Sequence, residues 1–278
     1  DHLEKIGQLE NTLVIVTSDH GMPFPFVKGQ IHEDGFRLPF VARWGKQIKP
    51  GRVVEDFINV RDIAPTFLEL AGVDRHPQIT GTSCVPLLKS DQSGWITGDR
   101  KVMLVGKERH DLGRPHNWGY PVRAIRTTEF LYVHNYHPER WPACDPETNF
   151  GNCDDSPTKG LIKILGGHFF DISFGFRPAD ELYRLSNDPH GVRNLANDPA
   201  YAETMAALKK QLLAQLRAEG DPRVLGNGAI FDTYDYVKQS PKDYGVWLKS
   251  RDTELSDEAE RRSGGKKSQD QPKRKRAP

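Results

Sequence analysis

The sequence Thr12-Leu-Val-Ile-Val-Thr-Ser-Asp-His-Gly21 joins an apolar run to a group of polar residues. Leu13 to Val16 is unbroken and rich in β-branched residues, which predicts a strand buried on both faces, as in a parallel sheet. Asp19 and His20 follow the C-terminal end of this strand. Because ligand sites in open α/β sheets lie outside the carboxyl ends of the strands, we expect a site here.

Asp19 and His20 place a carboxylate beside an imidazole, and both groups can bind a metal ion. Calcium and magnesium prefer oxygen ligands, whereas imidazole suits zinc, manganese or iron. In the alternative interpretation, Asp19 caps a turn and His20 is a polar residue with ordinary hydrogen-bond partners. The two residues alone leave both interpretations open.

A second stretch, Val27-Lys-Gly-Gln-Ile-His-Glu-Asp-Gly-Phe-Arg-Leu-Pro-Phe-Val41, belongs to the same region. The Pro, Gly and charged residues within 20–37 predict a long loop, and Leu38–Trp44 is typical of a second strand. Lys28 precedes a glycine in this loop, where its ammonium group could contact an anionic oxygen. The alternative is an ordinary surface lysine.

The composition bounds the class of protein. A chain of 278 residues can bury a sizeable core, and its net charge of +1 gives no overall field that favours nucleic acid or membrane. No apolar run approaches membrane-spanning length, and no secretory signal is visible at the start. The first ten residues resemble the interior of an amphipathic helix, so we expect the chain to begin within a domain.

Three cysteines are too few for a fold built on disulfides. Cys144 and Cys153 flank a polar loop and could either close a local bridge or stay reduced. Cys84 is then left over, as a small buried hydrophobic residue.

The predicted strands and helices divide the chain into four parts. Residues 1–100 are α/β, and residues 101–220 form a small subdomain of antiparallel sheet and helix with a long substrate loop. Residues 221–250 are an extension, and residues 251–278 are a disordered charged tail, in which Lys273–Arg276 is read as a solubilising run rather than a nuclear address or polyanion patch. Within the subdomain we expect strands at 102–105, 122–127, 130–135 and 181–185, an irregular loop over 136–180 and a helix over 198–218.

Several short motifs follow one another in a fixed order along the chain. They are Thr17-Ser-Asp-His-Gly21, Lys28-Gly29, Glu33-x-Gly35-x-Arg37-x-Pro39, Arg61-Asp-Ile-Ala-Pro-Thr-Phe-Leu-Glu-Leu-Ala-Gly-Val73, Thr80-Gly-Thr-Ser-Cys-Val-Pro-Leu-Leu88, and Glu181-Leu-Tyr-Arg-Leu-Ser-Asn-Asp-Pro189 with Asn194-Leu195. In this order they resemble the sulfatase branch of the alkaline-phosphatase superfamily. The resemblance covers most of residues 1 to about 220, and residues 19–26 are similar to the sulfoglucosamine sulfohydrolase (heparan N-sulfatase) subgroup.

The resemblance implies the C-terminal portion of a sulfatase: an α/β fold with part of the mixed sheet, followed by a small antiparallel α+β subdomain. It implies hydrolysis of a sulfate ester or sulfamate on a sulfated sugar such as a glycosaminoglycan, in a periplasmic, extracellular or lysosome-like compartment. Asp19 and His20 become ligands of one divalent cation, Ca²⁺ in most of the family, with Mg²⁺ or Mn²⁺ as alternatives. Lys28 becomes a contact of the sulfate group.

Sulfatases resembling this chain use a formylglycine nucleophile made from Cys or Ser in a Cys/Ser-x-Pro-x-Arg motif. Cys84-Val-Pro-Leu-Leu88 imitates its start, but Leu88 stands at the arginine position, so we reject it. We expect the nucleophile and two further metal-binding aspartates in an N-terminal half that precedes residue 1. The chain alone is then expected to be inactive.

His110, within Arg109-His110-Asp111, is the downstream candidate for a substrate contact or for the acid that protonates the leaving group. The alternative is an ordinary loop histidine. Arg109, Arg114 and His116 could bind sugar sulfates or carboxylates through charge-assisted hydrogen bonds. Glu33 and Arg37 are expected to form a structural ion pair.

Two other functions stay open from the sequence. One is a phosphodiesterase or phosphonate-ester hydrolase of the same superfamily, and the other is a non-catalytic polyanion-binding fragment that uses its basic tail. The sugar, the position of its sulfate and the oligomeric state are not encoded in any motif that we identify.

Overall fold

A four-stranded antiparallel sheet, in the order β3-β4-β5-β6, is the centre of the computed structural model, which describes residues 2–237 and 243–264. β4 (Val122–Thr127) and β5 (Phe130–Asn135) form a hairpin, and both have the predicted bounds. The hydroxyl oxygen of Thr127 accepts a 3.0 Å hydrogen bond from the Phe130 N–H, which closes the turn. β3 (Val102–Lys107) and β6 (Asp180–Arg184) lie at the edges.

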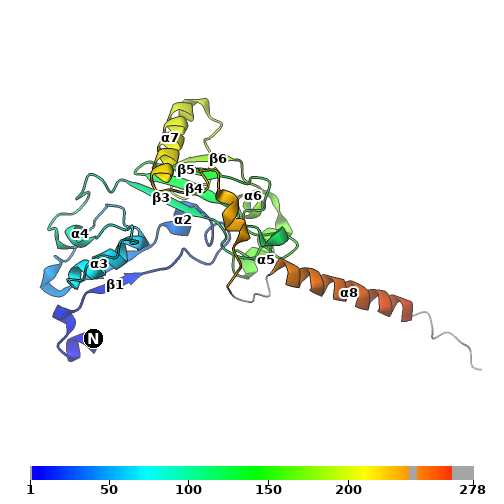
Figure 1. The fold of residues 1–278 in the computed structure, drawn as a ribbon, viewed down its shortest axis with the longest axis horizontal. Helices are drawn as coiled ribbons and strands as arrows, with labels where there is room; N and C mark the ends of the chain where they lie inside the picture. The colour runs from blue at the N-terminus through cyan, green and yellow to red at the C-terminus, as the bar shows by residue number, and fades with distance from the viewer. Residues whose placement is uncertain (1, 238–242, 265–278) are drawn as a thin grey trace, which may run out of the picture.

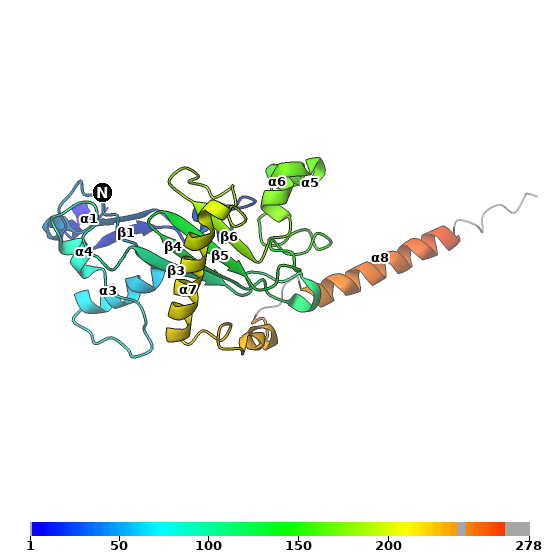
Figure 2. The same cartoon turned by 90° about the horizontal axis from the view of Figure 1, so that it is seen from above.

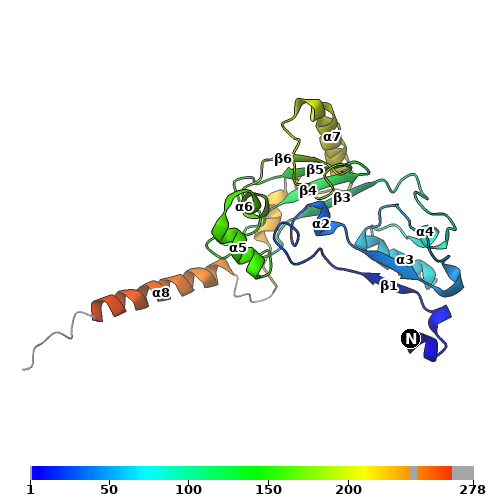
Figure 3. The ribbon, with the colours of Figure 1, turned by 180° about the vertical axis from the view of Figure 1, so that it is seen from behind.

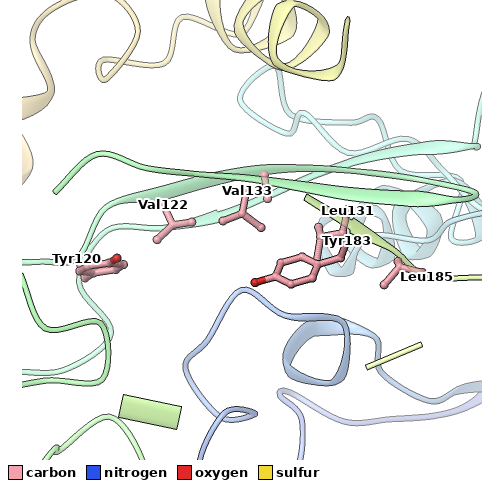
Figure 4. Close-up of a cluster of buried hydrophobic side chains, with 7 residues drawn as sticks. Tyr120, Val122, Leu131, Val133, Tyr183 and Leu185 are labelled. Carbon is pink, nitrogen blue, oxygen red and sulfur yellow. The ribbon is translucent and has the colours of Figure 1, made fainter. Parts of the chain in front are cut away.

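The two faces of this sheet are covered by different parts of the chain (Figures 1 and 3). α7 (Ala202–Ala218) packs on one face through Leu208, Leu212 and Leu216. The opposite face carries a cluster of buried side chains, and Figure 4 shows the segment between β1 and β2 lying against it. Successive side chains of a strand point to opposite faces, so β4 and β5 contribute to both clusters.

A buried ion pair fixes the segment between β1 and β2 to the sheet. Glu33, at the start of α2 (Glu33–Phe36), is 2% exposed and accepts hydrogen bonds of 2.8 and 2.9 Å from Arg126 of β4. The expected pair with Arg37 is present at 3.7 Å, but the Arg37 side chain is 73% exposed. The strong partner of Glu33 is therefore Arg126, which lies far away in sequence.

The prediction of a doubly buried strand at 13–16 is wrong. β1 (Val14–Thr17) pairs antiparallel with β2 (Phe40–Arg43), and within the described residues these two strands form a separate sheet. Val16 and Val41 pair with each other and are each 62% exposed. The apolar run correctly predicts a strand, but burial depends on what the rest of the chain packs against it.

The stretch over 136–180, expected to be irregular, contains two helices. Ser156 is the N-cap of α5 (Pro157–Leu165), and its hydroxyl oxygen accepts a hydrogen bond from the Lys159 N–H. Pro157 occupies the first helical position. α6 (Gly167–Phe174) follows directly, and Phe174 packs with Ala143 and Phe150 in a small core. Ser156 and Pro157 are local signals of a helix start, but the stretch lacks a regular spacing of apolar residues, so the sequence did not predict the helix.

The last described element is α8 (Tyr244–Gly264), which projects away from the rest of the molecule (Figures 1, 2 and 3). Residues 251–264, expected to be disordered, are helical here because the run contains no proline and many helix-forming Glu, Arg and Ala residues. The rest of the predicted tail, 265–278, including Lys273–Arg276, lies outside the described residues.

The remaining elements connect these parts, and α3 lies within the Arg61–Val73 motif. None of the helices described, over 2–237 and 243–264, has the length and apolar character needed to cross a bilayer. The shorter elements are α1 (His2–Lys5), η1 (Leu9–Asn11), η2 (Gly45–Gln47), η3 (Val60–Asp62), α3 (Ile63–Leu70), α4 (Val85–Lys89), η4 (Pro115–Asn117), η5 (Pro199–Tyr201) and η6 (Gly228–Thr233).

Candidate active site

Asp19 and His20 lie just beyond the end of β1 and face one another. The Nδ1 atom of His20 is 2.6 Å from the carbonyl oxygen of Gly21, and because a carbonyl only accepts, Nδ1 carries the proton. In the neutral ring the lone pair then lies on Nε2, and this atom is 3.7 Å from Oδ2 of Asp19. The side chains are 38% and 87% exposed, respectively. The pair presents an imidazole lone pair and a carboxylate on an open surface.

Glycine is required next to this pair because another segment passes very close. A Cβ atom on Gly21 would lie 2.1 Å from the backbone carbonyl oxygen of Asp34. The Gly21 N–H also donates a hydrogen bond of 3.2 Å to the carbonyl oxygen of Gly35. The segment around α2, which Glu33 fixes to the sheet, thereby fixes the backbone that carries His20.

Lys28 is not an ordinary surface lysine in this fold. Its Nζ atom lies 3.0 and 2.8 Å from the two carboxylate oxygens of Asp154, and its side chain is only 18% exposed. Asp154 comes from the loop that leads into α5. The ion pair orients the ammonium group, and a bound anion could take the place of the Asp154 carboxylate as its partner.

The His110 ring lies close to Gly29, the residue that follows Lys28. The φ of +71° at Gly29 favours glycine, and a Cβ atom there would lie 2.7 Å from Cδ2 of His110 and 3.1 Å from the carbonyl oxygen of Asn152. Lys107, the last residue of β3, donates a hydrogen bond from Nζ to the Gly29 carbonyl oxygen. The His110 ring thus rests on the residue that follows Lys28.

The electrostatic surroundings of His110 link it to the other predicted residues. Partial burial lowers its pKa below 6.5, and the positive charge of Lys107 lowers it further. Asp111 opposes the shift, whereas Lys28 and His20 add to it. Lys28 and His20 therefore lie near enough to His110 for their charges to act on it, although 82 and 90 positions separate them from it in the sequence.

Sequence reasoning missed Lys107. Its ammonium group lies 5.6 Å from the centre of the Tyr120 ring, and burial, followed by the charges of Arg114 and Arg177, lowers its pKa well below the usual value. The residue supports the Lys28–Gly29 backbone from the sheet. No sequence signal marked it, because Lys107 and Gly29 are brought together only by the packing of the β1–β2 segment on β3.

Replacing Gly29 with alanine is expected to destabilise the fold by about 1–2 kcal/mol through its left-handed backbone and to displace His110 and Asn152 as well. Gly51→Ala is the matched control, because Gly51 has a φ of +75° and nothing within 4 Å of the added Cβ. Urea unfolding of both variants measures the difference. Equal destabilisation of the two variants would show that contact with His110 has no energetic consequence.

The three other basic residues near His110 have different environments. Arg114 is 2% exposed and donates hydrogen bonds of 2.6 and 2.8 Å to the carbonyl oxygens of Trp141 and Pro142, so its expected contact with a sugar is wrong. His116 is exposed, and its ring centre is 4.7 Å from that of Trp118. Arg109 lines an open cleft.

All three cysteines are free and buried, so Cys144 and Cys153 do not form a bridge. Burial raises the pKa of the Cys84 thiol, and its side chain is 3% exposed. A thiol in this state is a poor nucleophile, in agreement with the rejection of the Cys84–Leu88 run.

The donor atoms present fit part of a cation site. Over residues 2–237 and 243–264 there is no group of three or more His, Cys, Asp and Glu side chains that could hold a metal ion. Ca²⁺ takes roughly six to eight oxygen ligands. Asp19 and His20 would therefore supply two ligands of a larger set.

Comparisons with known proteins agree with these motifs. Residues 19–149 match the family model described as N-sulphoglucosamine sulphohydrolase, C-terminal. An ulvan-active sulfatase of Formosa agariphila is 30% identical over 212 residues, 76% of this chain and 39% of that protein. Human N-sulphoglucosamine sulphohydrolase is 27% identical over 245 residues, 83% of this chain and 46% of its own length. The chain thus spans less than half of either relative.

A solved structure supports the fold. BT4656, described in complex with its substrate D-glucosamine-2-N,6-O-disulfate, has a TM-score of 0.57 and 24% identity, and the match covers 80% of this chain and 37% of that one. The shared architecture is the α/β, alkaline-phosphatase-like fold of sulfatases. With the family model and the curated relatives, it shows that this chain belongs to the sulfatase family and corresponds to its C-terminal region.

Proposed function

We propose that the protein is a sulfuric ester or sulfamate hydrolase that acts on a sulfated sugar. The observation that carries this proposal is the close approach of His110 to Gly29, the residue that follows Lys28, together with the Asp19–His20 pair at the end of β1. The relatives include an ulvan-active sulfatase and an N-sulphoglucosamine sulphohydrolase, which supports a sulfated carbohydrate as the substrate.

Asp19 and His20 are the residues that would bind the divalent cation. The Gly21 carbonyl oxygen fixes the His20 tautomer, so the Nε2 lone pair is presented beside the Asp19 carboxylate. A bound cation supplies a Lewis acid that polarises a sulfate oxygen. Ca²⁺ is the expected metal, with Mg²⁺, which likewise prefers oxygen ligands, and Mn²⁺, which also accepts an imidazole, as the alternatives.

Lys28 is the residue that would bind the sulfate group directly. Its side chain is only 18% exposed, and Asp154 already holds the ammonium group in position. When negative charge develops on the sulfuryl oxygens or on the leaving group, an ammonium fixed in advance stabilises that charge without reorganisation. A sulfate oxygen would replace one of the two contacts with Asp154.

His110 is the residue that would donate a proton to the leaving oxygen or nitrogen. Because its pKa is lowered, the ring is protonated only in acidic solution. We expect kcat/KM to fall as pH rises through an apparent pKa below 6.5, and His110→Gln to remove this limb of the profile. His168→Gln, at an exposed histidine of α6, is the control. A profile that is unchanged in His110→Gln would rule out the acid role.

The proposed compartment is periplasmic, extracellular or lysosome-like, as is expected for an enzyme whose substrate is a polysaccharide. Fractionation of the source cells, followed by detection of the protein with an antibody, tests this assignment.

The direct test of the proposed function is hydrolysis by the full-length protein. Release of inorganic sulfate from 4-nitrophenyl sulfate and from N- and O-sulfated glucosamine is measured beside release of phosphate from 4-nitrophenyl phosphate and its phenyl diester. We expect sulfate release to exceed phosphate release by at least about tenfold in kcat/KM, or 1.4 kcal/mol in transition-state stabilisation. A preference for phosphodiesters would instead support the other branch of the superfamily.

A further inference from the structure

An open cleft of about 480 Å³ begins at the residue next to His110. Ligand pockets are typically roughly 300–1,000 Å³, so this cleft can hold part of a sugar chain. It combines aromatic rings with one guanidinium group and two carboxylates. Its lining includes Glu108, Arg109, Phe231, Tyr234, Asp235 and Tyr236.

Arg109 is the cationic group of the cleft. Its guanidinium donates hydrogen bonds of 2.7 Å to the Tyr234 carbonyl oxygen and 3.4 Å to that of Asn117. Both acceptors are backbone carbonyl oxygens, so these bonds orient the group without neutralising its charge. A guanidinium has five N–H donors, which leaves donors for an anionic ligand.

Aromatic side chains form the wall beside this arginine. Tyr234 is 54% exposed and Tyr236 is 43% exposed, and the Arg109 guanidinium lies 5.8 Å from the centre of the Tyr236 ring. Phe231 supports Tyr234 from the side, with ring centres 6.0 Å apart. Exposed tyrosines present a flat apolar face with a polar edge, which suits the face of a pyranose ring.

The floor of the cleft is rigid. Glu108 accepts hydrogen bonds of 2.6 Å from Arg123 and 2.7 Å from Arg223. Arg123 also donates a 2.6 Å hydrogen bond to Asp221, so two arginines face two carboxylates and their charges balance. Among residues 2–237 and 243–264, the charged groups of the cleft that form no ion pair are Arg109 and the exposed Asp235.

We propose that this cleft is a second sugar subsite, which binds the ring next to the one that carries the hydrolysed sulfate. Tyr234 and Tyr236 stack on the ring, Arg109 binds its sulfate or carboxylate, and Asp235 accepts hydrogen bonds from its hydroxyl groups. The substrate class is therefore an anionic oligosaccharide rather than a single sugar. The inference rests on the proposed function only for the position of the first ring, which His110 would contact.

Binding and turnover test the subsite separately. The full-length protein, in EDTA to prevent turnover, is titrated calorimetrically with sulfated tetrasaccharides from heparin and from ulvan and with their chemically desulfated counterparts. We expect Tyr236→Ala and Arg109→Gln each to weaken binding of a sulfated tetrasaccharide about tenfold. Arg109→Lys is expected to recover part of the loss, because it retains charge but not the fork of donors.

Matched controls remove exposed groups elsewhere on the surface. Phe67→Ala on α3 truncates an aromatic ring that is 48% exposed, and Arg43→Gln on β2 removes an arginine that is 50% exposed. Both controls should bind like the unmodified protein. The subsite is wrong if cleft and control variants bind alike, if neither tetrasaccharide binds, or if the desulfated sugars bind equally well.

Turnover distinguishes failure of the subsite from failure of the proposed function. For an active enzyme, Tyr236→Ala should raise KM for the tetrasaccharide about tenfold and leave KM for 4-nitrophenyl sulfate unchanged. Tight, cleft-dependent binding without hydrolysis of any sulfate ester would overturn the proposed activity and retain the subsite. If the enzyme hydrolyses sulfate esters and the cleft variants leave KM for the tetrasaccharide unchanged, the proposed activity stands and the subsite is wrong.

Discussion

Replacing Asp19 with asparagine is expected to lower sulfate release by about a thousandfold or more and to remove the bound divalent cation. The Lewis-acid contribution of a catalytic metal is several kcal/mol, and each 1.36 kcal/mol corresponds to a factor of ten in rate. The substitution keeps the size of the side chain, and Asp19 is 87% exposed, so the fold should not change. Metal content by elemental analysis and kcat/KM for a sulfate ester are the two measurements.

Asp74→Asn is the control for this experiment, because Asp74 is an exposed acid in the loop after α3. It should retain both metal and activity. An Asp19→Asn protein with full metal content and full activity would remove the basis of the metal site. Loss of activity with metal retained would instead indicate that Asp19 acts on the substrate.

Lys28→Met is expected to lower kcat by roughly 100- to 1,000-fold, which is the usual effect of removing one preorganised donor to a developing negative charge. The substitution keeps the aliphatic part of the side chain, which is largely buried, and removes the ammonium group. It also leaves Asp154 without this partner, so its effect on stability must be measured separately by urea unfolding.

Two comparisons interpret that result. Lys210→Met, at an exposed position of α7, controls for the loss of a positive charge. Asp154→Asn keeps Lys28 and weakens the ion pair, so a Lys28 that binds sulfate should remain functional in this variant. If Lys28→Met and Asp154→Asn lower kcat equally, the ion pair has a structural role and the lysine does not bind the sulfate.

Local sequence patterns were sufficient to predict the β4–β5 hairpin and the position of Asp19 and His20 at the end of a strand. The apolar, β-branched and aromatic residues of β4 and β5, among them the continuous run Phe130-Leu-Tyr-Val133, are typical of strands and predict both of them. Likewise, the adjacency of Asp19 and His20 in the sequence ensures that they lie together after any strand that ends at Thr17. Sequence order also predicted the sulfatase family, which the comparisons confirm.

The tertiary structure alone decided which residues surround this pair. The sequence around Lys28 did not indicate that the His110 ring would lie close to Gly29. It also did not indicate that Lys107 of β3 would donate a hydrogen bond to the Gly29 carbonyl oxygen. The exposure of β1, and the cleft between Arg109 and Tyr236, likewise depend on segments distant in sequence. Short-range periodicity and capping determine helices and strands, whereas burial, charge pairing and clefts depend on which of those elements pack together.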